Sequence, residues 1–195
     1  MDKTVSILIC GVGGQGILLA SEVISGVCLK AGYDVRQSEV HGMAQRGGSV
    51  ISHIRFGAKV YSPIIDPGTA DFVVSFELLE TLRYAHFAHE GSTIITNTQR
   101  ILPVAVASGA VEYPKNIVER LRTLPVRVIA LDAFSEAKSL GDPRMVNMIL
   151  VGALSELLPF DGSLWREVLE RRLPAKILPS NIKAFDFGRA SVQKK

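Results

Sequence analysis

Short apolar runs alternate with amphipathic stretches along the chain. Residues 5–10 are apolar, a glycine-rich turn follows at once, and apolar residues then recur at helical spacing from Ile17 to Cys28. Gly32 is placed to end this helix, and residues 33–36 have the character of a second strand. This order predicts a parallel βαβ unit, in which a strand, a tight turn and a helix lead to the next strand.

The next part of the chain departs from a simple alternation of strands and helices. Residues 38–48 are polar and punctuated by glycines, which predicts a loop. Apolar and polar residues alternate over 50–56, which is typical of a half-buried strand, and residues 57–58 are expected to turn it back toward 60–61 as a hairpin. The hairpin is therefore predicted as an insertion into the α/β pattern.

The alternation then resumes and ends in a helical stretch. The pattern predicts strands at 70–75, 92–96 and 126–131. It predicts helices at 76–86, at 114–121, after Asp132 and at 143–158. Two C-terminal helices are expected to follow, one that starts after Asp161 or Ser163 and one that starts at 181, with a link between Pro174 and Pro179. Together these elements predict one α/β domain: a Rossmann-like three-layer fold with a mostly parallel sheet, an inserted hairpin and a helical C-terminal arm. We expect residues 1–160 to form the Rossmann-like domain and 161–195 the arm packed on it.

Composition narrows the classes of function. A net charge of +3 with scattered basic residues does not trace a phosphate backbone, so we expect no nucleic-acid partner, and polar interruptions leave no apolar stretch long enough to cross a membrane. The two cysteines, Cys10 and Cys28, lie among apolar residues and are too few for a four-iron cluster. We expect a cytoplasmic protein without a cleavable signal. A mean hydropathy of +0.25 suggests apolar surface that a partner or a second copy covers.

The first candidate site is the glycine turn, residues 11–16, with the sequence GVGGQG. It satisfies the G-x-G-x-x-G pattern between a predicted strand and a predicted helix, where free N–H groups and the helix dipole can receive a phosphate. Alternatively, the glycines only pack the strand against the helix. The candidate cofactor-binding residues of the turn are Gly11, Gly13, Gly14, Gln15 and Gly16.

Glu39 lies at roughly the spacing of the ribose-binding acid of a nicotinamide site, but it enters a glycine-rich segment instead of ending a clean second strand. No pair of side chains is arranged convincingly for hydride transfer. A stand-alone NAD-binding oxidoreductase therefore remains a second hypothesis. A non-catalytic assembly module whose glycine turn binds nothing is a third.

The segment 39–49, EVHGMAQRGGS, is the most specific part of the sequence. Together with the preceding GVGGQG and the following SHIRFG, it resembles the beta subunits of indolepyruvate:ferredoxin oxidoreductases. The gamma subunits of pyruvate and 2-oxoglutarate:ferredoxin oxidoreductases share the glycine turn and the Arg-Gly-Gly, but carry a Tyr-Gly-Pro-type stretch where this chain has His-Gly-Met-Ala. They are the alternative family assignment.

The resemblance implies a subunit that is inactive alone. In the family, a large partner holds thiamine diphosphate and 4Fe–4S clusters, decarboxylates an aryl 2-oxoacid, reduces ferredoxin and transfers the acyl group to coenzyme A (CoA). This chain is then expected to bind no cofactor tightly and to meet ferredoxin through the complex. In isolation it is a candidate homo-oligomer.

CoA is the ligand that the resemblance suggests for the glycine turn. Its diphosphate matches the turn together with Arg46, Gly47 and Gly48, because the guanidinium can grip phosphate oxygens. An ion pair across the subunit contact is the other role open to Arg46. His41 is the candidate catalytic residue, as a donor to substrate or cofactor, although a hydrogen bond within its own loop is favoured. His53, His86 and His89 are expected to be structural, and no metal site is expected.

Overall fold

A computed structural model describes residues 3–41 and 47–193, without the side chain of His41. Within these residues one six-stranded sheet has the order β2-β3-β1-β4-β5-β6. The strands are β1 (Val5–Val12), β2 (Asp34–His41), β3 (Ser49–Gly57), β4 (Ala70–Ser75), β5 (Ala88–Asn97) and β6 (Arg127–Leu131). Strands β1, β4, β5 and β6 pair in parallel, whereas β3 is antiparallel to both of its neighbours. The predicted mostly parallel sheet is thus confirmed.

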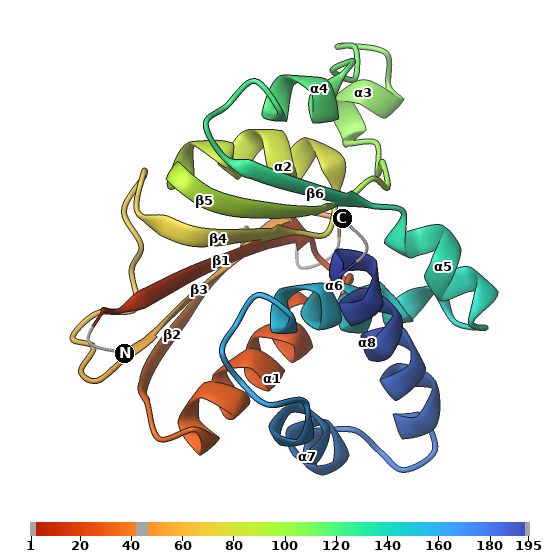
Figure 1. The fold of residues 1–195 in the computed structure, drawn as a ribbon. Coiled ribbons are helices and arrows are strands. Elements are labelled where there is room, and N and C mark those ends of the chain that lie inside the picture. The colour runs from red at the N-terminus through yellow and green to blue at the C-terminus, as the bar shows by residue number, and fades with distance from the viewer. Residues whose placement is uncertain (1–2, 42–46, 194–195) are drawn as a thin grey trace.

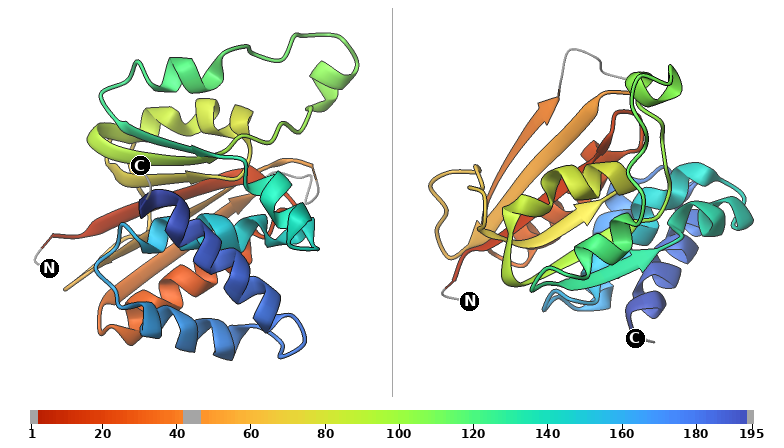
Figure 2. Two further views of the ribbon diagram at one scale, coloured as in Figure 1. Left: turned by 45° about the vertical axis from the view of Figure 1, so that its right-hand side comes forward. Right: turned by 90° about the horizontal axis from the view of Figure 1, so that it is seen from above.

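Helices cover both faces of the sheet and give three layers (Figures 1 and 2). One face carries α1 (Ile17–Lys30), α6 (Val146–Ser155), α7 (Gly162–Arg172) and α8 (Leu178–Gln193), and the other carries α2 (Leu78–Tyr84) and α4 (Ile117–Leu121). The remaining helical elements are α3 (Val104–Ala107), α5 (Ala133–Ser139) and the 3₁₀ turns Ala85–Phe87 and Pro143–Met145. This arrangement confirms the predicted α/β class.

Each face of the sheet has its own apolar core, and β1 contributes to both. Because successive side chains of a strand point to opposite faces, Ile7 and Ile9 pack with α1 and α6, while Leu8 and Cys10 pack with α2 and α4. Cys10 and the other cysteine, Cys28, are both buried, and burial raises the pKa of each thiol to about 12. The cysteines are packing residues, as the sequence predicts.

The C-terminal helices pack on the first face of the sheet. Helix α7 contacts α1, and α8 crosses α6 so closely that a Cβ atom at Gly188 would lie 2.0 Å from the carbonyl oxygen of Ile149. The division of the chain at residue 160 stays a prediction. Among the described helices none has the length and apolar character needed to cross a membrane.

The two strands of the predicted βαβ unit are not neighbours, because β3 lies between β1 and β2. Two predictions about the strands are wrong. First, β2 continues to His41 where a loop was predicted; as an edge strand, it tolerates the polar residues that suggested the loop. Second, residues 60–61 form no strand, and the inserted hairpin consists of β2 and β3, which pair from Asp34 with Gly57 to His41 with Val50.

Helix boundaries also differ from the prediction. Helix α4 begins at Ile117 and not at Pro114, because Asn116 in front of it has a left-handed backbone with φ of 54°. Pro179 lies in the first turn of α8, where a proline is tolerated because its missing N–H would have no helical partner. The predicted caps Asp132 and Asp161 are confirmed, since each side chain accepts a backbone N–H of its helix.

Candidate functional site

The glycine turn connects β1 with α1 and needs glycine for two reasons. Gly14 and Gly16 have φ values of 101° and 81°, a region that residues with a Cβ atom rarely adopt. A Cβ atom at Gly16 would also lie 2.6 Å from Nδ2 of Asn147 on α6. In contrast, nothing described lies within 4 Å of a Cβ placed on Gly14, so the backbone there is open to a ligand.

Gln15 holds the turn in place. Its Oε1 accepts the N–H of Val12 at 2.7 Å, and its Nε2 donates to the carbonyl of Phe76 at 3.0 Å. The side chain therefore ties the end of β1 to the residue that follows β4. Gln15 shapes the turn from inside the protein, and this use of its carboxamide was not apparent from the sequence.

The end of segment 39–49 is hydrogen-bonded to the glycine turn. The N–H of Gly13 donates to the carbonyl of Gly48 at 2.8 Å, and the N–H of Gly47 donates to the carbonyl of Gly13 at 3.3 Å. The structure thus brings together the turn and the glycines of the Arg-Gly-Gly motif. Arg46 and the side chain of His41 lie outside the described residues, so the positions of these two candidates stay predictions.

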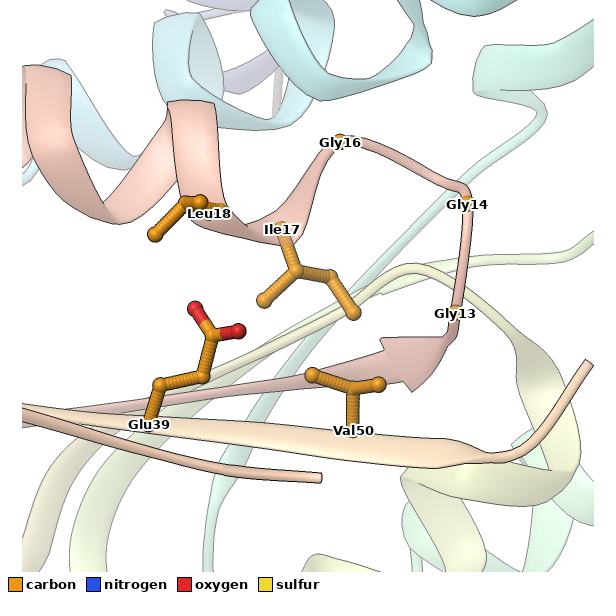
Figure 3. A pocket seen from close by; sticks show the side chains of 7 residues that line it. All are labelled: Gly13, Gly14, Gly16, Ile17, Leu18, Glu39 and Val50. Atoms are coloured by element: carbon orange, nitrogen blue, oxygen red, sulfur yellow. The ribbon is translucent and has the colours of Figure 1, made fainter. Parts of the chain in front are cut away.

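A cavity of about 430 Å³ lies beside the turn (Figure 3). Its lining consists of Gly13, Gly14, Gly16, Ile17, Leu18, Glu39 and Val50. The carboxylate of Glu39 points toward Leu18, and the side chains of Ile17 and Val50 point toward one another (Figure 3). Sequence reasoning considered Glu39 only as a ribose-binding acid, and it missed the apolar lining because helical spacing does not distinguish the end of a core from the wall of a cavity.

A smaller recess of about 160 Å³ lies on the other side of Gly14. It is lined by Gly14, Gln15, Gln99, Ile101, Phe134, Pro143, Arg144 and Val146. The guanidinium of Arg144 binds Asp142 through two nitrogens, at 3.0 and 2.7 Å, and remains largely exposed. The glycine turn therefore lies between two recesses that are both mainly apolar, the larger with Glu39 in its wall and the smaller with the Asp142-paired Arg144 at its rim.

Two buried carboxylates support the turn from the α2 side. Glu80 accepts a hydrogen bond from the hydroxyl of Ser49, immediately after the Arg-Gly-Gly motif, and pairs with Arg83 at 2.9 Å. Burial raises the pKa of the Glu80 carboxyl, while Ser49 and Arg83 oppose the rise. The second carboxylate, Glu77, accepts the hydroxyl of Tyr113 at 2.7 Å.

Glu77 also accepts the N–H of Ile101 at 3.0 Å and caps α2 through the N–H of Glu80. It therefore joins α2 to the long connection between β5 and α4. Sequence reasoning missed both acids. Their signal is two glutamates three residues apart at the start of a predicted helix, a spacing that places both on the same face of the helix.

The remaining histidines have structural contacts. His53 is buried, its Nδ1 accepts the N–H of Ile65 at 3.2 Å, and burial lowers its pKa. The Nδ1 atoms of His86 and His89 each lie within hydrogen-bond distance of a backbone carbonyl. Within the described residues, no group of three or more acidic, histidine or cysteine side chains is placed to hold a metal ion.

Comparisons with known proteins give a consistent result. The family model described as pyruvate ferredoxin/flavodoxin oxidoreductase matches residues 6–191. Four relatives named indolepyruvate oxidoreductase subunit IorB are 36–42% identical to the chain. The one from Pyrococcus horikoshii is 42% identical over 193 residues, which cover 95% of each chain.

Solved structures agree on the fold. The gamma subunit of a keto/oxoacid ferredoxin oxidoreductase from Geobacter sulfurreducens superposes with a TM-score of 0.74 at 19% identity, covering 98% of this chain and 99% of that one. A 2-oxoglutarate:ferredoxin oxidoreductase from Magnetococcus marinus, with 2-oxoglutarate, coenzyme A and succinyl-CoA bound, gives a TM-score of 0.77 at 22% identity. This match covers 100% of the present chain and 32% of the Magnetococcus chain.

Proposed function

The chain belongs to the pyruvate ferredoxin/flavodoxin oxidoreductase family, and we propose that it is the small subunit of an indolepyruvate:ferredoxin oxidoreductase. The observation that carries the proposal is the likeness to the IorB subunits, which extends over 95% of the chain. The segment EVHGMAQRGGS, with His-Gly-Met-Ala in place of a Tyr-Gly-Pro-type stretch, favours this assignment over a pyruvate or 2-oxoglutarate enzyme.

The proposed reaction converts an aryl 2-oxoacid, CoA and two oxidised ferredoxins into an aryl-acetyl-CoA, carbon dioxide, a proton and two reduced ferredoxins. The large subunit supplies thiamine diphosphate and the 4Fe–4S clusters. Thiamine diphosphate provides the decarboxylation chemistry, and the clusters carry the two electrons one at a time. Ferredoxin meets the small subunit only within this complex, which we place in the cytoplasm.

The contribution of this chain is to bind CoA at the glycine turn. The open backbone at Gly14, the left-handed turn before α1 and the recesses on both sides suit a long ligand with a diphosphate at its centre. The Magnetococcus enzyme, whose fold is shared, was solved with CoA bound. Arg46 would add a cation from the neighbouring segment, Gly47 and Gly48 would hold that segment against the turn, and His41 would be a candidate donor to substrate or cofactor.

Self-association of the isolated chain is a further part of the proposal. Leu102, Val104 and Val111 all lie on the connection between β5 and α4 and are exposed, Val104 by 86%. Apolar side chains of this size favour a covered position. A second copy of the chain would cover them when the large subunit is absent.

Substrate preference tests the proposed function. The chain is co-expressed with the large subunit of the same organism, and the purified complex is assayed anaerobically with indolepyruvate, phenylpyruvate, pyruvate and 2-oxoglutarate. We expect CoA-dependent ferredoxin reduction that is fastest with the aryl substrates. A preference for pyruvate or 2-oxoglutarate would contradict the proposed substrate class, and oxidation of a substrate by the isolated chain with NAD would contradict the subunit role.

A further inference from the structure

The recesses on the two sides of the glycine turn differ in volume and in the charged residue that lines each of them, Glu39 in the larger and Arg144 in the smaller. We propose that the cavity of about 430 Å³ beside the turn takes the pantetheine arm of CoA, and that Glu39 accepts a hydrogen bond from an amide or hydroxyl group of that arm. This inference rests on the proposed function, since it specifies how the ligand of the glycine turn is oriented.

Glu39 has an unused acceptor in the wall of the cavity. The residue lies on β2 opposite Ser52 of β3, and its carboxylate points into the cavity (Figure 3). Its Oε2 is screened from solvent, and no donor among the described residues lies within hydrogen-bond distance. A carboxylate that lacks a donor is costly where it is shielded from water. A ligand in the cavity that brings an N–H or O–H group to the part of the carboxylate that lines the cavity lowers that cost.

The other walls of the cavity are aliphatic. Ile17 and Val50 are almost fully buried, and Leu18, which also lines the cavity, has 52% of its surface exposed. Such walls stabilise an aliphatic group by removing apolar surface from water. The occupant is therefore expected to be uncharged, partly aliphatic and equipped with hydrogen-bond donors.

The pantetheine arm is the part of CoA that meets this description. It is uncharged, and it has a dimethyl-substituted carbon, a hydroxyl group and two amide N–H groups. The nucleotide end is different, because its ribose has a phosphate on the 3′ oxygen, next to the hydroxyl that an acid could otherwise bind. A carboxylate placed at that ribose would face the phosphate at close range, where two negative charges repel.

The inserted strand supports the same orientation. In the usual dinucleotide-binding arrangement, the ribose-binding acid follows a strand that lies beside β1. Here β3 occupies that place, so Glu39 is set back by one further strand spacing, about 4.8 Å. A ribose joined directly to a diphosphate on the glycine turn is poorly placed for Glu39, whereas a longer arm can reach it. The nucleotide is left with the opposite side of the turn, where Arg144 lines the smaller recess.

The test compares whole CoA with its nucleotide end alone. In the complex with the large subunit, we would measure the KM for CoA and the competitive inhibition constant of adenosine 3′,5′-bisphosphate, which lacks the arm. Glu39→Ala is expected to raise the KM for CoA roughly tenfold, the loss typical of a hydrogen bond to a charged group, and to leave the inhibition constant of the nucleotide unchanged. Glu39→Gln keeps an acceptor oxygen and is expected to have a smaller effect.

Glu170→Ala is the matched control, because it removes an exposed acid on α7. Co-purification and the unfolding midpoint establish that each variant is folded. An equal rise in the KM for CoA and in the nucleotide inhibition constant would overturn the inference, since the nucleotide end would then occupy the cavity. An unchanged or lower KM for CoA would also overturn it.

Failure of the proposed function gives a different result. Gly13→Val changes the glycine turn itself. If this variant leaves the KM for CoA and the nucleotide inhibition constant unchanged, CoA does not bind at the turn, and the proposed role of this chain in CoA binding is wrong. If Gly13→Val weakens both ligands but neither Glu39 variant changes the KM for CoA, only the orientation proposed here is wrong.

Discussion

The N–H of Gly13 donates to the carbonyl of Gly48 at 2.8 Å, so the glycine turn and the Arg-Gly-Gly motif form one backbone unit. The two glycines are far apart in the sequence and meet because β3 lies beside β1. A change in the turn is therefore expected to disturb the motif as well. This relationship also places Gly47 and Gly48 next to the proposed CoA site.

Replacing Gly13 tests this unit. Gly13→Val puts a β-branched residue, whose backbone is more restricted than that of glycine, at the position that exchanges backbone hydrogen bonds with Gly47 and Gly48. We expect CoA-dependent turnover of the complex to be lost, together with some stability. Steady-state kinetics at varied CoA would check the effect, and co-purification with the large subunit would separate it from failed assembly. Full turnover by the Gly13→Val complex would leave the turn without a binding role.

Arg46 tests the electrostatic part of the CoA site. Loss of a charge-assisted contact with phosphate is expected to cost about 1.5–3 kcal/mol, so Arg46→Ala should raise the KM for CoA roughly tenfold to a hundredfold while the complex still assembles. Arg46→Lys should restore only part of the affinity, because an ammonium lacks the planar fork. Loss of co-purification in Arg46→Ala would instead identify an anchor to the large subunit.

The Glu77–Tyr113 hydrogen bond predicts a stability effect away from the site. Tyr113→Phe removes a donor from a buried carboxylate and is expected to lower the free energy of unfolding by about 1–3 kcal/mol. Urea denaturation of the isolated chain would measure the change. Tyr61→Phe is the control, because Tyr61 is 89% exposed and should change the unfolding free energy by less than about 0.5 kcal/mol. Equal effects of the two variants would contradict the role assigned to Glu77.

Glu80 predicts a pH dependence of stability. The pKa of the Glu80 carboxyl is raised in the folded protein, so folding favours the protonated carboxyl. The protonated carboxyl stabilises the fold at pH values below the pKa of this group in the unfolded chain. This stabilisation is lost as pH rises through the pKa of the group in the folded protein. Glu80→Gln cannot ionise. The stability of the variant relative to the natural chain should therefore increase as pH rises from the ordinary glutamate pKa, about 4.3, toward neutrality, as urea titrations at several pH values would show. A constant difference across this range would contradict the shift.

Part of the fold and the site could be predicted from the sequence because local patterns determine them. The apolar run of β1, the GVGGQG turn and the helical spacing after Ile17 predict strand, turn and helix correctly, since each depends on neighbouring residues. The place of β3 could not be predicted, because pairing between β1, β2 and β3 depends on contacts distant in the sequence. A polar edge strand also has the same composition as a loop, which explains the error at residues 38–41.

The cavity beside the turn was missed for a related reason. Glu39 and Val50 come from two strands whose register was unknown, and their proximity follows only from the β2–β3 pairing. The acids Glu77 and Glu80 could have been recognised as sharing one face of a helix, but not their partners Tyr113 and Ser49, which come from distant segments. Local motifs therefore identified the glycine turn, whereas the residues that surround it depend on the order and pairing of the strands.

Reconstitution from separate subunits tests the central claim most directly. The purified chain is titrated into the large subunit, and the initial rate of ferredoxin reduction with indolepyruvate is measured with and without CoA. The account predicts that the rate rises to a plateau at one chain per large subunit, that it requires CoA, and that neither subunit alone supports it. Full CoA-dependent activity of the large subunit alone, or no change on adding the chain, would contradict the account.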